Sequence, residues 1–176
     1  MNAYYTYLIS SLPMLSFSSK LPFSLEDFFT KCKGLVPEEK IDLLRAACQQ
    51  ELHLLQAASG HTLGKWVHFE TALRNELIRA RAHRKKIDPL AFVRLPDWPD
   101  AHISHAAISA YRSTSVLEAE KILDLERWNF LESLNISHYF DFDSLLVYAL
   151  KLKIMERWDK IQSADKESLF NATVRN

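Results

Sequence analysis

Two aspartates stand one residue apart in the segment HYFDFDSLLVYALKLKIMERW, which covers residues 138–158. Asp141 and Asp143 could together ligate a divalent cation, because calcium and magnesium prefer carboxylate oxygens. Such a site needs further ligands, and the apolar sequence that follows offers none in its first two helical turns. Asp143 directly precedes Ser144, where a helix is expected to begin, and a carboxylate there can accept hydrogen bonds from free N–H groups. We therefore expect Asp143 to be a helix N-cap rather than a metal ligand.

A second candidate metal site is the pair His102 and His105, whose spacing places both imidazoles on one side of a helix. Two histidines so arranged can ligate one zinc ion. No cysteine lies near the pair, and the sequence contains no H-E-x-x-H pattern of the kind found in zinc hydrolases. We therefore expect no metal site at either pair.

The other residue types that could do chemistry are not arranged for it. Only three glycines occur, so the sequence lacks the glycine-rich loops that bind phosphates or dinucleotides. No serine lies in a G-x-S-x-G pattern. Cys32 and Cys48 fall on the apolar sides of expected helices, where a thiol behaves as a small hydrophobic group. We expect no catalytic site and no cofactor.

One marked cluster of positive charge remains. Between residues 74 and 86 a lone carboxylate, Glu76, is outnumbered by Arg74, Arg79, Arg81, Arg84, Lys85 and Lys86. At 3.6 residues per turn, Arg74, Arg81 and Lys85 share one helical face. The cluster is either a solvated helix end that offsets the helix dipole or an ion-pairing surface for an acidic protein partner. Nucleic acid is a poorer fit, because 22 basic residues balance 22 acidic ones and no aromatic residue interleaves with the cluster.

Apolar residues recur at helical spacing through most of the chain, so we expect an all-α fold, a compact domain of about six to seven helices. Residues 1–87 should hold a helical hairpin and a long helix that ends near residue 86. The proline-containing segment 88–100 is the expected connector. Residues 101–176 should supply further helices that pack on the same core.

Local signals mark where several of these helices begin and end. Ser24 with Asp27 and Ser115 with Glu118 match the capping-box pattern, and Gly34 is placed to end a helix. On the helix that begins at Ser115, the expected apolar side comprises Leu117, Leu125, Trp128, Leu131 and Leu134.

The two ends of the chain are harder to interpret. The segment Tyr4–Ile9 is rich in aromatic and β-branched residues, which favours a strand, and a short buried helix is the alternative. The helix expected near residues 144–161 is apolar on two faces. It is therefore either the central helix of the fold or partly a contact surface, at Trp158, for another protein. Residues after Ser163 are polar and expected to fray.

Nothing in the sequence indicates a membrane span or a secretion signal. The longest apolar run, residues 145–150, is far short of the roughly 20 residues that a membrane span needs. A signal peptide requires a positively charged residue before its apolar stretch, and no lysine or arginine precedes the apolar stretch at this N-terminus. We expect a cytoplasmic protein.

Three segments resemble a known group of proteins: residues 4–15 (YYTYLISSLPML), residues 66–97 with their FETALR motif, and residues 139–158, in which aromatic residues lead into an apolar helix. They resemble a bacterial family of uncharacterised proteins encoded in V-type ATPase operons. More distantly, they are similar to the C-type (or d-type) subunit of V- and A-type rotary ATPases. Proteins of the C-type family are larger and built from several related helical units, so the resemblance implies a truncated or minimal member.

The resemblance implies an all-helical, non-catalytic protein that links the central stalk to the membrane rotor, peripheral to the inner membrane. Its partners would be the stalk and membrane-ring proteins, contacted through Arg74, Arg81, Lys85 and Trp158. An independent helical adaptor for another acidic protein is the second function class. A metal-dependent enzyme using Asp141, Asp143, His102 or His105 is the third.

Overall fold

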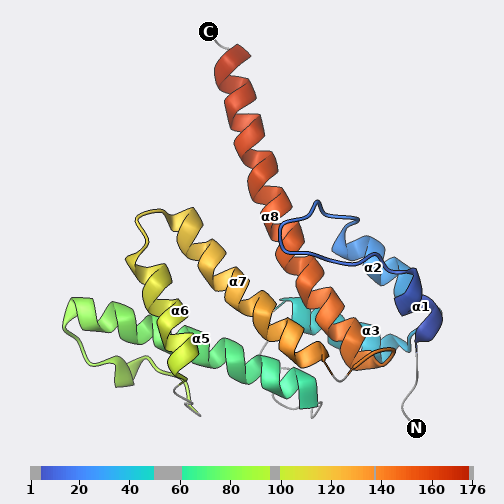
Figure 1. The fold of residues 1–176 in the computed structure, drawn as a ribbon, viewed down its shortest axis with the longest axis horizontal. Coiled ribbons are helices and arrows are strands. Elements are labelled where there is room, and N and C mark those ends of the chain that lie inside the picture. The colour runs from blue at the N-terminus through green and yellow to red at the C-terminus, as the bar shows by residue number, and fades with distance from the viewer. Residues whose placement is uncertain (1–4, 50–60, 96–99, 137, 175–176) are drawn as a thin grey trace. The chain divides into compact units, whose positions relative to one another are not determined.

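The structure is a computed structural model that describes residues 5–49, 61–95, 100–136 and 138–174, with side chains described as far as residue 164. Within these ranges the regular elements are seven α-helices and one short 3-10 helix (Figure 1). The predicted all-α fold is therefore confirmed. Contacts between residues divide the chain into two units, one of residues 1–51 with 134–176 and the other of residues 52–133.

The first unit is built around α8 (Phe142–Val174). Helices α2 (Leu25–Cys32) and α3 (Glu38–Gln49) both pack against α8 (Figure 1). The prediction that this C-terminal helix is apolar on more than one face is confirmed by its buried side chains, which are Leu145, Leu146, Val147, Ala149, Leu150, Leu152, Ile154 and Met155. Because both of its apolar faces are covered, α8 is the central helix of this unit. The helix also continues to Val174, well beyond the predicted end near residue 161.

The N-terminal segment forms a short helix, α1 (Thr6–Ser11), so the strand preference of residues 4–9 was misleading. A lone strand would have left its backbone groups unpaired. Instead the backbone N–H of Tyr5 donates to the carbonyl of Phe140, with an N–O distance of 2.6 Å. Farther along, the hydroxyl of Tyr148 donates to the carbonyl of Pro13 at 3.0 Å. These two bonds join the beginning of the chain to the beginning of α8.

Helix α2 begins and ends as its sequence predicts. The Ser24 side chain accepts from the Asp27 backbone N–H, and the Asp27 carboxylate accepts from the Ser24 backbone N–H, which completes the capping box. The helix ends at Cys32, and Gly34 follows two residues later with a φ of 76°, in the left-handed region that favours glycine. A side-chain Cβ at this position would meet no atom within 4 Å, so the requirement for glycine comes from the backbone alone.

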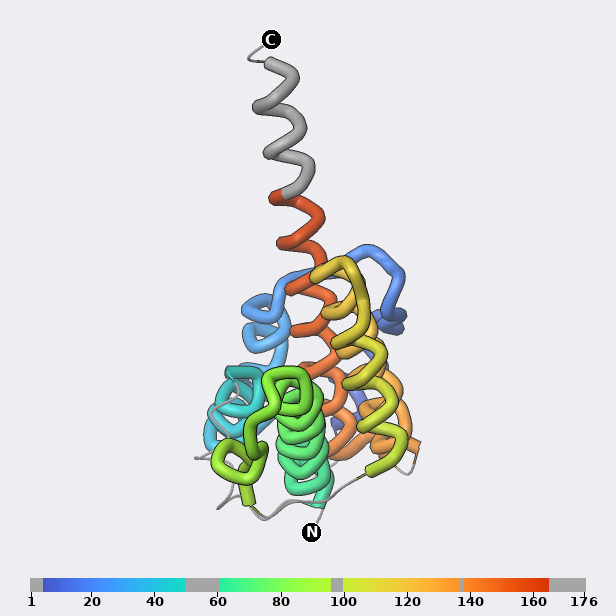
Figure 2. The backbone as a smooth tube through the Cα atoms, turned by 90° about the vertical axis from the view of Figure 1, so that its left-hand side faces the viewer, coloured from blue at the N-terminus to red at the C-terminus, as the bar shows by residue number. Residues whose placement is uncertain are grey.

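The second unit contains α5 (His61–Lys85), the 3-10 helix η1 (Pro89–Ala91), α6 (Ala101–Arg112) and most of α7 (Val116–Asn135). Helix α6 lies beside α5 (Figures 1 and 2). The rings of Phe69 on α5 and Phe130 on α7 stack with their centroids 4.1 Å apart, and the ring centroid of Trp66 lies 6.4 Å from that of Phe130. The predicted long helix is therefore confirmed, together with its buried apolar side at Trp66, Phe69 and Leu73.

Helix α7 departs from the predicted apolar side. Trp128, Leu131 and Leu134 are buried as expected, whereas Leu117 is 45% exposed and Leu125 is 43% exposed. The capping pattern at its start is half formed: Ser115 Oγ accepts from the Glu118 backbone N–H at 3.3 Å. The Glu118 carboxylate accepts from the Ser113 hydroxyl.

Buried polar groups on α5 are paired with other elements of the second unit. Glu70, on α5, accepts from Nε of Arg127 on α7 at 2.7 Å, and Arg127 also donates to Asp124 at 2.8 Å. The amide of Asn75, which is fully buried, donates to the carbonyl of Arg94 at 2.9 Å and accepts from its N–H at 3.0 Å. The amide thus pairs with the backbone much as a neighbouring strand would, and fixes the segment after η1 against α5.

Among the described residues, no helix combines the length and the apolar composition that crossing a membrane would require.

Candidate partner-binding site

The cationic residues predicted as a partner surface lie on α5, in the second unit. Arg81 and Lys85 are exposed, and Arg74 is half-buried. Within the described part of the chain, no carboxylate forms an ion pair with Arg81 or Lys85. Because α5 is a continuous helix through all three positions, they share one face, as predicted. Their role in binding a partner stays a prediction.

Trp158, the fourth residue of the predicted partner surface, lies on α8 in the first unit. Its ring meets the ring of Phe17 edge to face, with centroids 6.5 Å apart, and the side chain is half-buried. Part of Trp158 therefore packs within its own unit, and the part left exposed could still contact a partner.

A groove that the sequence did not reveal lies on another side of α5. It is formed by the last turns of α5, the segment after it and one side of α6, and its volume is about 1000 Å³. Arg84, Lys86 and Arg112 contribute cationic side chains to its lining, and Ile87 and Ile108 contribute apolar ones. Two of these cations belong to the cluster visible in the sequence. Arg112 stands 28 positions after Arg84, and only the packing of α6 beside α5 brings it to the same groove.

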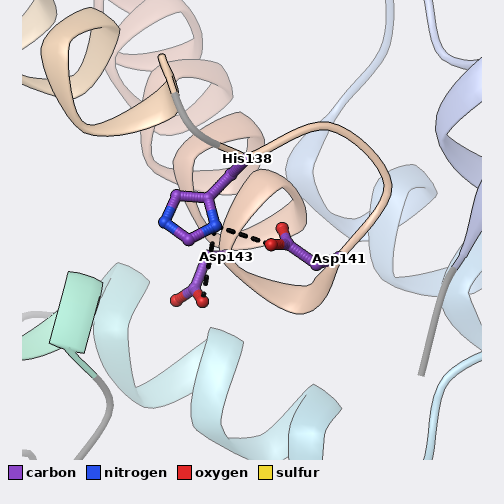
Figure 3. A group of neighbouring side chains, drawn as sticks. All are labelled: His138, Asp141 and Asp143. Carbon is purple, nitrogen blue, oxygen red and sulfur yellow. Dashed lines mark hydrogen bonds and ion pairs between the residues drawn. The ribbon is translucent and has the colours of Figure 1, made fainter. Parts of the chain in front are cut away.

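The carboxylates Asp141 and Asp143 form a cluster with a third residue, His138, at the start of α8 (Figure 3). One potential ligand atom from each residue lies within 4.8 Å of the others. His138 Nδ1 is 2.6 Å from Asp141 Oδ2 and 3.8 Å from Asp143 Oδ2. His138 was not predicted as a member of this cluster, although it opens the same segment of the sequence.

The N-cap of α8 is Asp141, so the prediction that Asp143 would cap this helix was wrong. Helix α8 begins at Phe142, and Asp141 Oδ1 accepts from the backbone N–H of Ser144 at 2.9 Å and from its hydroxyl at 3.1 Å. Burial alone would raise the pKa of the Asp141 carboxyl, but the hydrogen bonds from His138 and Ser144 outweigh burial and lower it. Oδ1 of Asp141 thus starts the helix, while Oδ2 contacts His138.

The other candidates for chemistry lie apart. The side chain of His102 is 79% exposed and contacts Glu126 of α7 through Nδ1 at 2.8 Å, and His105 is exposed on the same helix. Burial raises the pKa of Cys32 to about 11 and that of Cys48 to about 12. Both thiols therefore stay protonated near neutral pH and are poor nucleophiles.

Comparison with known proteins matches part of the chain to a family. Residues 104–176, less than half of the chain, match the family described as "Protein of unknown function (DUF2764)". The matched region begins within α6 and includes α7 and α8, so it contains residues 139–158, the third of the segments that carry the resemblance. No curated protein and no solved structure matches the chain.

Proposed function

We propose that this protein is a non-catalytic component of a V-type ATPase, similar to the C-type subunit, that links the central stalk to the membrane rotor. The observation that carries the proposal is the resemblance of residues 4–15, 66–97 and 139–158 to proteins of V-type ATPase operons and to the C-type family. The proposal gives the chain a mechanical role, in which it holds neighbouring proteins of the complex together and transmits torque between them.

The arrangement of two of these segments supports the proposal. Residues 4–15 and 139–158 come from opposite ends of the chain, yet they meet in the first unit through the Tyr5 bond to Phe140 and the Tyr148 bond to Pro13. The similarity therefore concerns residues that build one body around α8.

The helical character of the chain also supports a mechanical role. Torque is carried best by elements that do not bend, and a helix whose apolar faces are both covered, as α8 is as far as Met155, has many side-chain contacts to resist bending. The exposed cations of α5 supply a charged surface on which an acidic neighbour can dock. An independent helical adaptor would share these structural features. What favours the ATPase component over the adaptor is therefore the sequence resemblance.

The test is co-purification from membranes of a cell that makes the protein. An affinity-tagged full chain is recovered in mild detergent, and the accompanying proteins are identified by mass spectrometry. Stalk and membrane-ring proteins of the ATPase should be recovered in fixed proportion to the tagged protein. A tagged helical protein of similar size and charge serves as the control for non-specific recovery.

Charge reversal tests the predicted contact surface in the same experiment. Arg81→Glu together with Lys85→Glu should reduce the recovery of ATPase proteins, while circular dichroism shows an unchanged helical fold. Absence of every ATPase protein from the unsubstituted sample would overturn the proposed function. Recovery of a different acidic protein in fixed proportion would favour the independent adaptor.

A further inference from the structure

The groove beside the end of α5 exposes apolar surface that the fold does not cover. Ile87, just after α5, is 46% exposed, and Ile108, on α6, is 39% exposed. Both line the groove together with Ala80 and Pro89. Burying such side chains would contribute about 25 cal/mol of favourable free energy for each Å² of apolar surface removed from water. An apolar group from another molecule would recover that free energy by filling the groove.

The charged side chains around this apolar surface are mostly cationic. Among the described residues of the lining the single carboxylate is Glu76, which is buried and forms an ion pair with Arg79. Arg84 donates to the hydroxyl of Tyr111 at 3.4 Å. Within the described residues, no carboxylate pairs with Arg84, Lys86 or Arg112. The groove therefore has an excess of positive charge that the described residues do not neutralise.

We propose that this groove binds an acidic amphipathic segment of a protein partner. Its apolar side chains lie against Ile87 and Ile108, and its carboxylates pair with Arg84, Lys86 and Arg112. The inference rests on the proposed function, because the partner is taken to be another protein of the ATPase. It adds to that function a second contact surface. The groove-lining residues Arg79, Ala80 and His83 lie about 120–180° around the α5 axis from the centre of the face that carries Arg81 and Lys85, at 3.6 residues per turn.

The dimensions and exposure of the groove favour a protein segment over other ligands. A small-molecule site buries some 70–90% of its ligand, whereas six of the described lining residues are themselves exposed: His83, Arg84, Lys86, Ile87, Ile108 and Arg112. Single-stranded nucleic acid is bound largely by stacking of bases on several aromatic rings, and among the described lining residues only Tyr111, whose hydroxyl accepts from Arg84, is a phenylalanine, tyrosine or tryptophan. A helix with apolar residues at positions i, i+3, i+4 and i+7 fits an apolar floor with a charged rim.

The first measurement uses the purified full chain and a synthetic helical peptide with leucines at positions i, i+3, i+4 and i+7 and glutamates between them. Fluorescence anisotropy should detect saturable binding that weakens as salt is added. Arg84→Glu together with Arg112→Glu should weaken binding by about 10-fold or more, because two attractive contacts become repulsive. The control Lys65→Glu with Lys121→Glu makes the same charge change on exposed lysines of the same unit and should leave binding unchanged.

A third variant separates lost charge from lost folding. Lys86 has a φ of 54°, in the left-handed region, so glycine suits its backbone better than lysine does. Lys86→Gly should weaken peptide binding while the protein becomes more stable. The inference would be overturned if the peptide bound the Arg84 and Arg112 variant as tightly as it binds the Lys65 and Lys121 control. It would also be overturned if a single-stranded oligonucleotide or anionic lipid vesicles bound the protein more tightly than the peptide does.

Co-purification with the same variants distinguishes this inference from the proposed function. If the unsubstituted protein recovers ATPase proteins and the Arg84 and Arg112 variant recovers them equally well, the groove is not the contact and the proposed function stands. If the unsubstituted protein recovers none, the proposed function fails, and the peptide titration still decides whether the groove binds acidic segments.

Discussion

Replacing Arg127 by methionine should cost the protein about 3–5 kcal/mol of folding free energy, the typical loss when one partner of a buried ion pair is removed. The guanidinium group lies between two carboxylates, Glu70 on α5 and Asp124 on α7 itself. Side-chain exposure is 17% for Arg127, 8% for Glu70 and 1% for Asp124, so water screens these charges little. Methionine keeps most of the aliphatic volume and removes the charge and its hydrogen bonds.

The magnitude follows from the bonds that are lost. Nε and Nη1 of Arg127 donate at 2.7 and 2.8 Å, and Nη2 makes a longer contact of 3.5 Å. A hydrogen bond to a charged group contributes roughly 1.5–3 kcal/mol, so the two short bonds alone account for the lower end of the expected loss. The rest is the cost of leaving two carboxylates buried without their cation.

The assay is urea unfolding at neutral pH, followed by circular dichroism and by tryptophan fluorescence and analysed by linear extrapolation. Arg81→Met is the control, because Arg81 is exposed and its replacement should change stability by less than about 0.5 kcal/mol. Adding Glu70→Met and Asp124→Leu to the Arg127 variant should restore most of the lost stability, since none of the three charges of this group is then left buried. A loss below about 1 kcal/mol for the single variant would refute the assignment of Arg127 as the buried partner of both carboxylates.

Three further changes test local features by the same urea assay. Asn75→Ala should cost about 2–3 kcal/mol, because both hydrogen bonds to the Arg94 backbone are lost from a buried site; a cost near zero would mean that water replaces the amide. Lys86→Gly should raise stability by about 1 kcal/mol, because it relieves the left-handed backbone at the end of α5; a decrease would contradict this. Asp141→Ala should cost about 1 kcal/mol at pH 7 through loss of the N-cap of α8. The pKa of Asp141 is lowered in the folded protein, so its contribution to stability is fully present above the ordinary carboxyl pKa of 3.8 and is lost as the pH falls through the pKa of the folded state. The difference in unfolding free energy between the unsubstituted protein and Asp141→Ala should therefore shrink in acid. A constant difference down to about pH 2 would contradict the cause given for the lowered pKa.

The features predicted well from the sequence are those that depend on neighbouring residues. The capping box at Ser24 and the glycine at the end of α2 need only a few residues on either side, and the structure contains both. A contact of the same local kind starts the single turn of η1, where Asp88 accepts from the Leu90 N–H. Such contacts form whatever the rest of the chain does, so local sequence is sufficient to find them.

The predictions that were wrong depended on distant residues. The N-terminal segment is helical even though its residue types favour a strand, and the described residues contain no strand that could pair with it. Asp141 rather than Asp143 caps α8, and local pattern alone does not separate two aspartates that lie two positions apart. Leu117 and Leu125 were expected on the apolar side of α7 from their chemical type, yet each is more than two-fifths exposed. The grouping of both chain ends into one unit also depends on contacts that no scan along the sequence reveals.

The groove was missed for a related reason, although part of its charge was visible in the sequence. Helix α5 carries buried polar residues, Glu70, Asn75 and Glu76, among its buried apolar ones, so its apolar pattern does not show which sides are covered. Hydrogen bonds from Arg127 and to the Arg94 backbone are directional, and they fix the rotation of α5 before its last turns begin. The exposed cations at the end of α5 are therefore carried by a helix whose orientation is set by its middle. This is the arrangement that a docking site requires, because charges held in position before binding lose less entropy when a partner arrives.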